Sequence, residues 1–177
     1  MAQDLKQSRH RGNCGDSKDK GRVVKVKRLY IAYGSNLNLK QMEYRCKTAK
    51  VYGKGSIKGY RLLFKGSPGN AYLTIEAKAG EEVPVVIWEI KPDDEKELDR
   101  YEGYPSFYYK ENIPVELETG ETVTAMVYIM TKKIKDRIEL NLPSKSYLEA
   151  VKEGYESFGF NLKYLDKSLE ASKTMEV

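Results

Sequence analysis

A glycine-containing pentapeptide is the first segment of this sequence that could carry out chemistry. Tyr33-Gly34-Ser35-Asn36-Leu37 lies between an apolar, β-branched run and a run with helical spacing. A turn at such a junction can direct several backbone N–H groups at one point, and helix N-termini attract negative charge. The pentapeptide therefore indicates either a site for a developing negative charge or an ordinary strand-to-helix turn.

Glu102 is the candidate acid/base. It follows Leu98 by four residues and shares its face of a helix predicted over about 92–101. Burial and the negative end of a helix dipole both raise the pKa of a carboxyl group, toward the value that suits a base at neutral pH. The alternative interpretation is a solvated glutamate at a fraying helix end.

Other catalytic groups are scarce. The chain has one histidine, His10, and two cysteines, Cys14 and Cys46. This set disfavours a Ser-His-Asp triad, a histidine-activated cysteine and a four-ligand zinc site. No glycine-rich phosphate-binding motif is present. We therefore expect no metal and no cofactor, and a site built from carboxylates, backbone amides and some of the 14 tyrosines.

The net charge of +5 belongs to the N-terminus, because residues 28–177 hold equal numbers of basic and acidic side chains. Residues 1–22 are polar and are predicted to form a disordered tail, followed by one domain over 23–177. The neutral body disfavours nucleic-acid binding. The absence of a long apolar run and of a signal-like start, with only two cysteines, favours a cytoplasmic protein without a membrane span.

The pattern of apolar residues predicts an α+β fold, a small mixed β-barrel or strongly curled sheet with flanking helices. Asn36 or Asn38 could cap the first helix, and Ser146 with Glu149 has capping-box spacing. Gly154 and Gly159 are interpreted as helix breakers. The predicted strands cover 23–33, 51–57, 60–65, 71–77, 83–90, 107–117 and 122–129, and the helices 37–46, 92–101, 147–152 and about 161–173.

Four sequence blocks, taken in order, resemble the gamma-glutamylcyclotransferase family. They are Tyr30 to Leu37 (YIAYGSNL), Val85 to Ile90 with Leu98 to Gly103 (VVIWEI and LDRYEG), Thr124 to Thr131 (TAMVYIMT), and Leu142 to Tyr147 (LPSKSY). The resemblance covers about residues 28–170. The connector 131–142 and the tail match nothing in it.

The resemblance implies a cofactor-free reaction on a gamma-glutamyl amide. The free α-amine attacks the side-chain carbonyl and releases 5-oxoproline and an amino acid, with Glu102 moving both protons. It also implies that the substrate is held by the first block and by pocket tyrosines. These expected binding residues are Tyr30, Ala32, Tyr33, Gly34, Ser35, Asn36, Leu37, Tyr128 and Tyr147, with Tyr109 added because it lies on the expected inward face of its strand.

Two other functions stay open at this point. Within the family, the chain could act on gamma-glutamyl-amines or remove a gamma-glutamyl protecting group in biosynthesis; Tyr128 and Pro143 to Tyr147 favour the amino-acid-releasing branch. In another class, it could be a non-catalytic small-molecule-binding barrel, although such a barrel has no need of Glu102 as a base. The expected partner is a small-molecule gamma-glutamyl substrate, not a membrane or nucleic acid, and a homodimer is left open.

Overall fold

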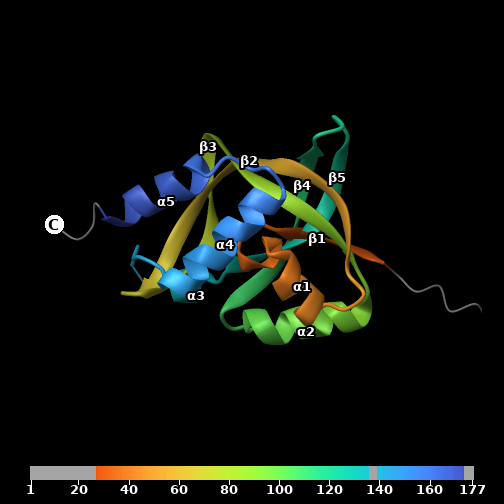
Figure 1. Ribbon diagram of the computed structural model, residues 1–177, viewed down its shortest axis with the longest axis horizontal. Coiled ribbons are helices and arrows are strands. Elements are labelled where there is room, and N and C mark those ends of the chain that lie inside the picture. Colours follow the sequence, from red (N-terminus) through yellow and green to blue (C-terminus); the bar gives the residue numbers. More distant parts are fainter. Residues whose placement is uncertain (1–26, 136–138, 174–177) are drawn as a thin grey trace, which may run out of the picture.

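The computed structural model describes residues 27–135 and 139–173, in which five strands close into a barrel with helices on its outside (Figure 1). This architecture confirms the predicted α+β fold class. The order of strands around the barrel is β1-β3-β2-β4-β5. The strands are β1 (Arg28–Ala32), β2 (Lys50–Ser67), β3 (Asn70–Ile90), β4 (Tyr108–Leu117) and β5 (Thr122–Met130). The helices are η1 (Ser35–Leu37), α1 (Leu39–Arg45), α2 (Pro92–Glu102), α3 (Lys132–Lys135), α4 (Lys145–Ser157) and α5 (Lys163–Lys173).

Strand β1 closes the barrel. It pairs with β3 in antiparallel fashion, Ile31 opposite Ile87, and with β5 in parallel fashion, Ile31 opposite Val127. All three of these side chains are fully buried, and burying an aliphatic side chain of this size stabilises a fold by about 1.5–3 kcal/mol. The apolar sequence of β1 therefore fixes the position from which the Gly34 turn leaves the barrel.

Strands β2 and β3 are longer than the sequence predicted, because each joins two runs that were expected to be separate strands. The pairing passes from Lys58–Glu82 directly to Tyr60–Ala77. Gly59 and Gly80 take φ values of +76° and +80° at this irregularity. Glycine inside a strand commonly marks a bulge, at which the strand bends without ending. The glycines therefore curve the hairpin around the barrel.

The helix caps differ in part from the sequence prediction. Asn38, rather than Asn36, caps α1, since its Oδ1 accepts a hydrogen bond from the Gln41 N–H at 3.2 Å. Ser144, rather than Ser146, caps α4, and its Oγ accepts from the Tyr147 N–H at 3.2 Å. Both caps satisfy N–H groups that would otherwise lack a partner at the helix start.

Helix α4 continues through Gly154 to Ser157, so the prediction of a break at Gly154 is wrong. A Cβ at Gly154 would lie 2.6 Å from Leu37 Cβ and 2.8 Å from the Leu37 carbonyl carbon. Glycine is present here because it lets α4 approach η1 closely. This contact holds the turn after β1 against the C-terminal part of the chain.

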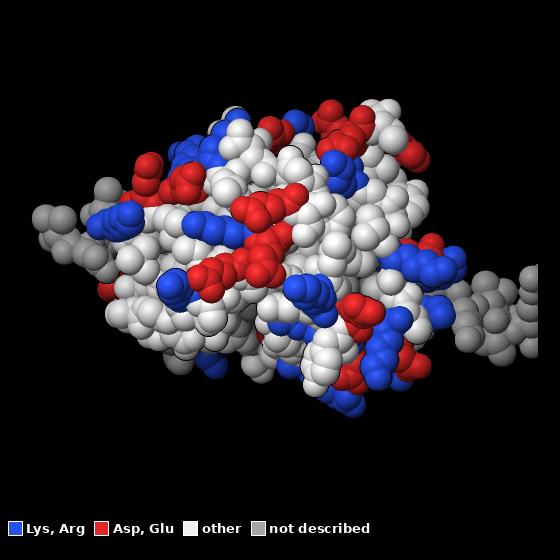
Figure 2. Space-filling model, viewed as in Figure 1, with Lys and Arg blue, Asp and Glu red and all other residues white. Residues whose placement is uncertain are grey.

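The surface mixes charges of both signs over the face shown in Figure 2. The connector over 131–142 forms α3 and then an isolated bridge between Leu140 and Lys65. None of the helices in the described ranges has the length and hydropathy to cross a membrane. The predicted tail over 1–22, with His10 and Cys14, lies outside the described residues.

Candidate active site

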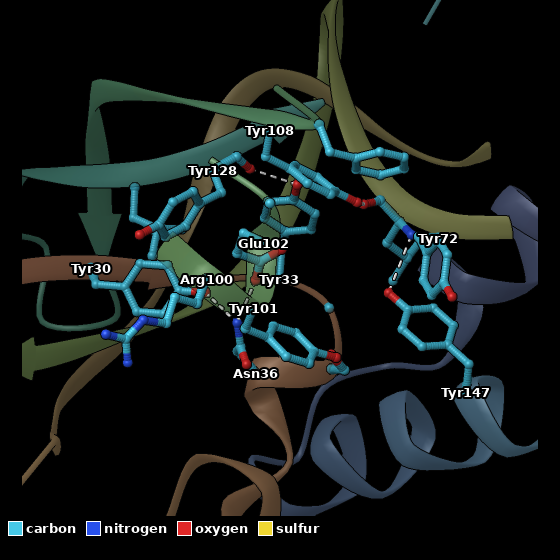
Figure 3. A pocket seen from close by; sticks show the side chains of 16 residues that line it. Tyr30, Tyr33, Asn36, Tyr72, Arg100, Tyr101, Glu102, Tyr108, Tyr128 and Tyr147 are labelled. Atoms are coloured by element: carbon cyan, nitrogen blue, oxygen red, sulfur yellow. Dashed lines mark hydrogen bonds between the residues drawn. The ribbon is translucent and has the colours of Figure 1, made fainter. Parts of the chain in front are cut away.

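A cavity of about 410 Å³ opens where β1, η1, the end of α2 and the start of α4 meet. Its wall contains most of the residues that the sequence singled out: Tyr30, Tyr33, Gly34, Ser35, Asn36, Glu102, Tyr128 and Tyr147. Segments far apart in the sequence therefore meet at one place, and Figure 3 shows their side chains around Glu102.

Glu102 is the last residue of α2 and places its carboxyl group in the cavity wall. The Asn36 amide nitrogen donates a hydrogen bond to Glu102 Oε1 at 2.8 Å. Burial raises the pKa of this carboxyl group to about 7, and the Arg45 charge and the Asn36 hydrogen bond oppose the rise. A carboxyl group with this pKa can both accept and donate a proton near neutral pH.

Asn36 is held in one orientation by its neighbours. Its Oδ1 accepts from Arg45 Nη1 at 2.6 Å, which directs the amide nitrogen toward Glu102 and toward the Tyr30 hydroxyl at 2.7 Å. The Trp88 indole N–H donates to the Asn36 carbonyl oxygen at 3.2 Å. Because the side-chain oxygen, the side-chain nitrogen and the backbone carbonyl oxygen of Asn36 are all hydrogen-bonded, this buried residue holds the Glu102 carboxylate in a fixed position.

Arg45 is a member of this network that the sequence did not predict. It lies in the last turn of α1, and its guanidinium lies 3.5 Å from the centre of the Tyr101 ring. Its Nη1 also donates to Ser35 Oγ at 3.3 Å. The position of Arg45 in the sequence does not predict its contact with Asn36, because that contact depends on how α1 packs against η1.

The tyrosine hydroxyl groups mostly bind the protein itself. Tyr33 donates to the Tyr128 carbonyl oxygen at 2.7 Å, and Tyr128 donates to Asp99 Oδ1 at 2.6 Å. Burial raises the pKa of both hydroxyl groups above that of free tyrosine. These side chains therefore remain neutral at physiological pH and shape the cavity instead of acting as bases.

Gly34 and the first residues of η1 border the cavity. The Leu37 N–H is bound within the turn, to the Gly34 carbonyl oxygen at 2.9 Å. The first N–H groups of a helical turn have no partner inside it, and Gly34, Ser35 and Asn36 line the cavity. These three residues, without Leu37, can therefore present backbone donors to a bound oxygen.

Three of the expected binding residues do not line the cavity. Ala32 and Leu37 are buried in the core, and the Tyr109 side chain is 37% exposed, with its hydroxyl 3.2 Å from Glu111 Oε2. The alternation along β4 correctly separates two faces, but the cavity contacts the face of Tyr108. The sequence placed Tyr109 inward because it alternates with Ile113, Val115 and Leu117, which are buried; at the start of β4, however, Tyr108 is buried and Tyr109 is exposed.

The remaining wall residues were not predicted. They are Ile31, Tyr72, Leu73, Arg100, Tyr101, Gly103, Phe107 and Tyr108. Ile31, Arg100, Tyr101 and Gly103 lie within the sequence blocks that resemble the family, but they were not singled out. For Tyr72 and Tyr108 the only signal is the large number of tyrosines, which does not say which of them meet. Across the described ranges, no three His, Cys, Asp or Glu side chains form a group that could hold a metal ion.

Comparison with known proteins agrees with this geometry. A family described as gamma-glutamyl cyclotransferase, AIG2-like, matches residues 30–149. Curated gamma-glutamylcyclotransferases from Homo sapiens and Bos taurus are each 29% identical over an alignment of 147 residues that covers 78% of this chain and 76% of the relative. A solved structure titled gamma-glutamyl cyclotransferase superposes with a TM-score of 0.71 at 26% identity, covering 81% of this chain and 86% of that one. The family match spans more than half of the sequence and both ends of the cavity, and the chain belongs to the gamma-glutamyl cyclotransferase, AIG2-like family.

Proposed function

We propose that the chain is a cyclotransferase that cleaves gamma-glutamyl amides and releases 5-oxoproline and a free amino acid. The observation that carries this proposal is the Glu102 carboxyl group, which is held by Asn36 in the cavity with a pKa of about 7. A group of this kind suits a reaction that needs one proton removed and one delivered at the same place.

The reaction requires the substrate to fold on itself. With Glu102 ionised, its free carboxylate oxygen takes a proton from the substrate α-ammonium group. The amine then attacks the γ-carbonyl carbon, and the developing oxyanion is met by backbone donors of Gly34, Ser35 and Asn36. As the carbon–nitrogen bond to the leaving group breaks, Glu102 returns the proton to that nitrogen. The ionised carboxylate then takes the remaining extra proton from the ring nitrogen, which becomes the lactam N–H, and passes it to the released amine. The five-membered ring closes without a covalent enzyme intermediate.

The alternative of a non-catalytic binding barrel is disfavoured by the placement of Glu102. Burying a carboxylate is unfavourable by several kcal/mol unless it is compensated, and a mere binding wall gains nothing from it. The curated relatives named above carry the gamma-glutamylcyclotransferase name, which favours an amino acid over a simple amine as the leaving group.

The test is incubation of the purified protein with gamma-glutamyl-alanine, with 5-oxoproline measured by chromatography. Glu102→Gln should lower kcat by about 10²–10⁴-fold, the usual loss when a general acid/base is removed. Glu111→Gln, a carboxylate exposed on β4 outside the cavity, is the matched control. Parallel assays with gamma-glutamyl-amines distinguish the two branches. A Glu102→Gln protein with wild-type kcat would refute the mechanism.

A further inference from the structure

One end of the cavity is built from aromatic and aliphatic side chains. Tyr72, Leu73, Phe107, Tyr108 and Tyr147, here called the aromatic subsite, all line it. We propose that the aromatic subsite binds the leaving group and selects gamma-glutamyl amides whose leaving amino acid has an aromatic or large aliphatic side chain. This inference rests on the proposed function, and it names the class of substrate.

The rings of the aromatic subsite are arranged as a partly open cage. The Tyr72 ring meets the Tyr147 ring edge to face at 5.1 Å between centroids, and it meets Phe107 at 6.4 Å. Phe107 and Tyr108 are 5.2 Å apart. Tyr72, Phe107 and Tyr147 remain partly exposed. Their uncovered apolar surface lies in the cavity wall, where an apolar ligand would remove it from water.

The hydroxyl oxygens of these tyrosines are hydrogen-bonded to the protein, and Tyr72 and Tyr108 also use their O–H groups in this way, so the subsite presents mainly rings. Tyr108 donates to the Leu73 carbonyl oxygen at 2.8 Å, and Tyr72 donates to Asn70 Oδ1 at 2.8 Å. The Tyr147 hydroxyl accepts the Leu73 N–H at 3.2 Å. A wall that is rich in tyrosine is therefore apolar over most of its surface.

The polar groups lie at the other end of the cavity. Asn36 donates a hydrogen bond to Glu102, the proposed acid/base, and Figure 3 shows Tyr72 and Tyr147 on one side of Glu102 and Tyr30 with Arg100 on the other. The substrate amine must reach Glu102, so the glutamyl group occupies the polar end. The leaving group then extends toward the aromatic subsite.

Charge reinforces this orientation. Of the described residues that line the cavity, Arg100 and Glu102 carry charge, and Arg100 forms an ion pair with Glu97 on α2. A charged side chain placed among Tyr72, Leu73 and Phe107 would lose water without gaining a partner, which is unfavourable. The side chain of gamma-glutamyl-phenylalanine loses no such hydration and gains contact with the rings, and the α-carboxylate of the leaving amino acid is common to all the amides compared.

The decisive measurement is binding, because it does not depend on turnover. Glu102→Gln is titrated by calorimetry with gamma-glutamyl-phenylalanine, gamma-glutamyl-alanine and gamma-glutamyl-glutamate. We expect the phenylalanine amide to bind about 10-fold or more tightly than the other two, the scale that one or more buried methylene groups provide. Equal affinities, or a preference for the glutamate amide, would overturn the inference.

Variants of the subsite locate the preference. Phe107→Ala should weaken binding of the phenylalanine amide about 10-fold and leave the alanine amide within about 2-fold. Phe107→Leu, which keeps an apolar group, should retain most of the preference and serves if the alanine variant melts early. Tyr44→Ala is the matched control, since Tyr44 is 86% exposed on α1. An unchanged preference in Phe107→Ala would count against the subsite.

Assays of the wild-type protein separate the two proposals. If no amide releases 5-oxoproline, the proposed function fails, while the binding series still decides for or against the aromatic subsite. If all three amides are cleaved with the same kcat/KM and bind equally, the function stands and the subsite fails. A kcat/KM that is about 10-fold higher for the phenylalanine amide supports both.

Discussion

Glu102→Gln should make the protein more stable at alkaline pH as well as inactive. Burial raises the pKa of Glu102 from 4.5 to about 7, so the folded state holds this proton more tightly than the unfolded chain does. The stability that the bound proton contributes is complete below about pH 4.5 and is lost as the pH rises through about 7. Above that pH the wild-type fold contains a buried, ionised carboxylate.

The size of the effect follows from the pKa. One pKa unit corresponds to about 1.4 kcal/mol, so the rise from 4.5 to about 7 amounts to about 3 kcal/mol. This is an upper value, because the carboxyl group borders the cavity, where water can partly solvate its charge. Glutamine is neutral at every pH and keeps the oxygen to which Asn36 donates. The free energy of unfolding of Glu102→Gln, relative to wild type, should therefore increase by up to about 3 kcal/mol between pH 4 and pH 8.

Urea unfolding at pH 4, 6 and 8 measures this difference directly. Thermal melts should show a relative gain of about 6–12 °C in Tm at pH 8, at roughly 2–4 °C per kcal/mol for a domain of this size. Glu111→Gln, whose side chain is exposed on β4, should show no such trend. If Glu102→Gln differs from wild type by the same free energy at pH 4 and pH 8, the burial of an ionised Glu102 is refuted.

Three further substitutions test the charge near Glu102, the packing of α4 against η1 and the Gly34 turn. Arg45→Met removes the charge that lowers the pKa of Glu102, so the acid limb of the kcat/KM profile should move to higher pH, and an unmoved limb would contradict the network. Gly154→Ala should lower the free energy of unfolding, measured in urea, by about 1–3 kcal/mol, because the added Cβ would overlap Leu37. This loss should outweigh the better helix propensity of alanine. A variant as stable as wild type would argue against the close packing. Gly34→Val should raise KM strongly while Tm changes little, because a Cβ added at this position would lie 3.3 Å from the Tyr147 hydroxyl oxygen in the cavity wall. Normal steady-state kinetics would exclude a cavity role for this turn.

Local rules predicted that the Gly34 turn and Glu102 lie at the ends of regular elements, but they left an ordinary turn and a solvated glutamate as alternatives; the resemblance to the family selected both for the site. A strand, a glycine turn and a helix follow each other in the sequence, and the Gly103 that ends α2 takes the left-handed conformation that favours glycine, with φ at +64°. Periodicity also separated the two faces of β4. The face of Ile113, Val115 and Leu117 is buried as expected, but the same alternation extended to the start of the strand favoured Tyr109 where the structure has Tyr108.

Glycine was the least reliable guide in the sequence. Gly59 was interpreted as part of a turn between strands, yet it lies in a bulge within β2, and Gly154 was interpreted as a helix end, yet it lies inside α4. A sequence shows that glycine is present but not whether it serves backbone conformation or close packing. The same limit hid Arg45, whose role depends entirely on how α1 packs against the turn.

The position of β1 constrains the order in which the barrel can form during synthesis. Among the strands that the structure describes, β1 leaves the ribosome before the others, but its partners are β3, which ends at Ile90, and β5, which ends at Met130. Until β5 has emerged, the apolar strand has an unpaired edge, the kind of surface on which nascent chains associate wrongly. Its parallel pairing joins Ile31 to Val127, a long-range contact of the sort that slows folding. A nascent chain stalled before Met130 should therefore depend on a chaperone. A chain released after Ser157 has every described strand of the barrel and the whole of α4, which packs against the turn after β1.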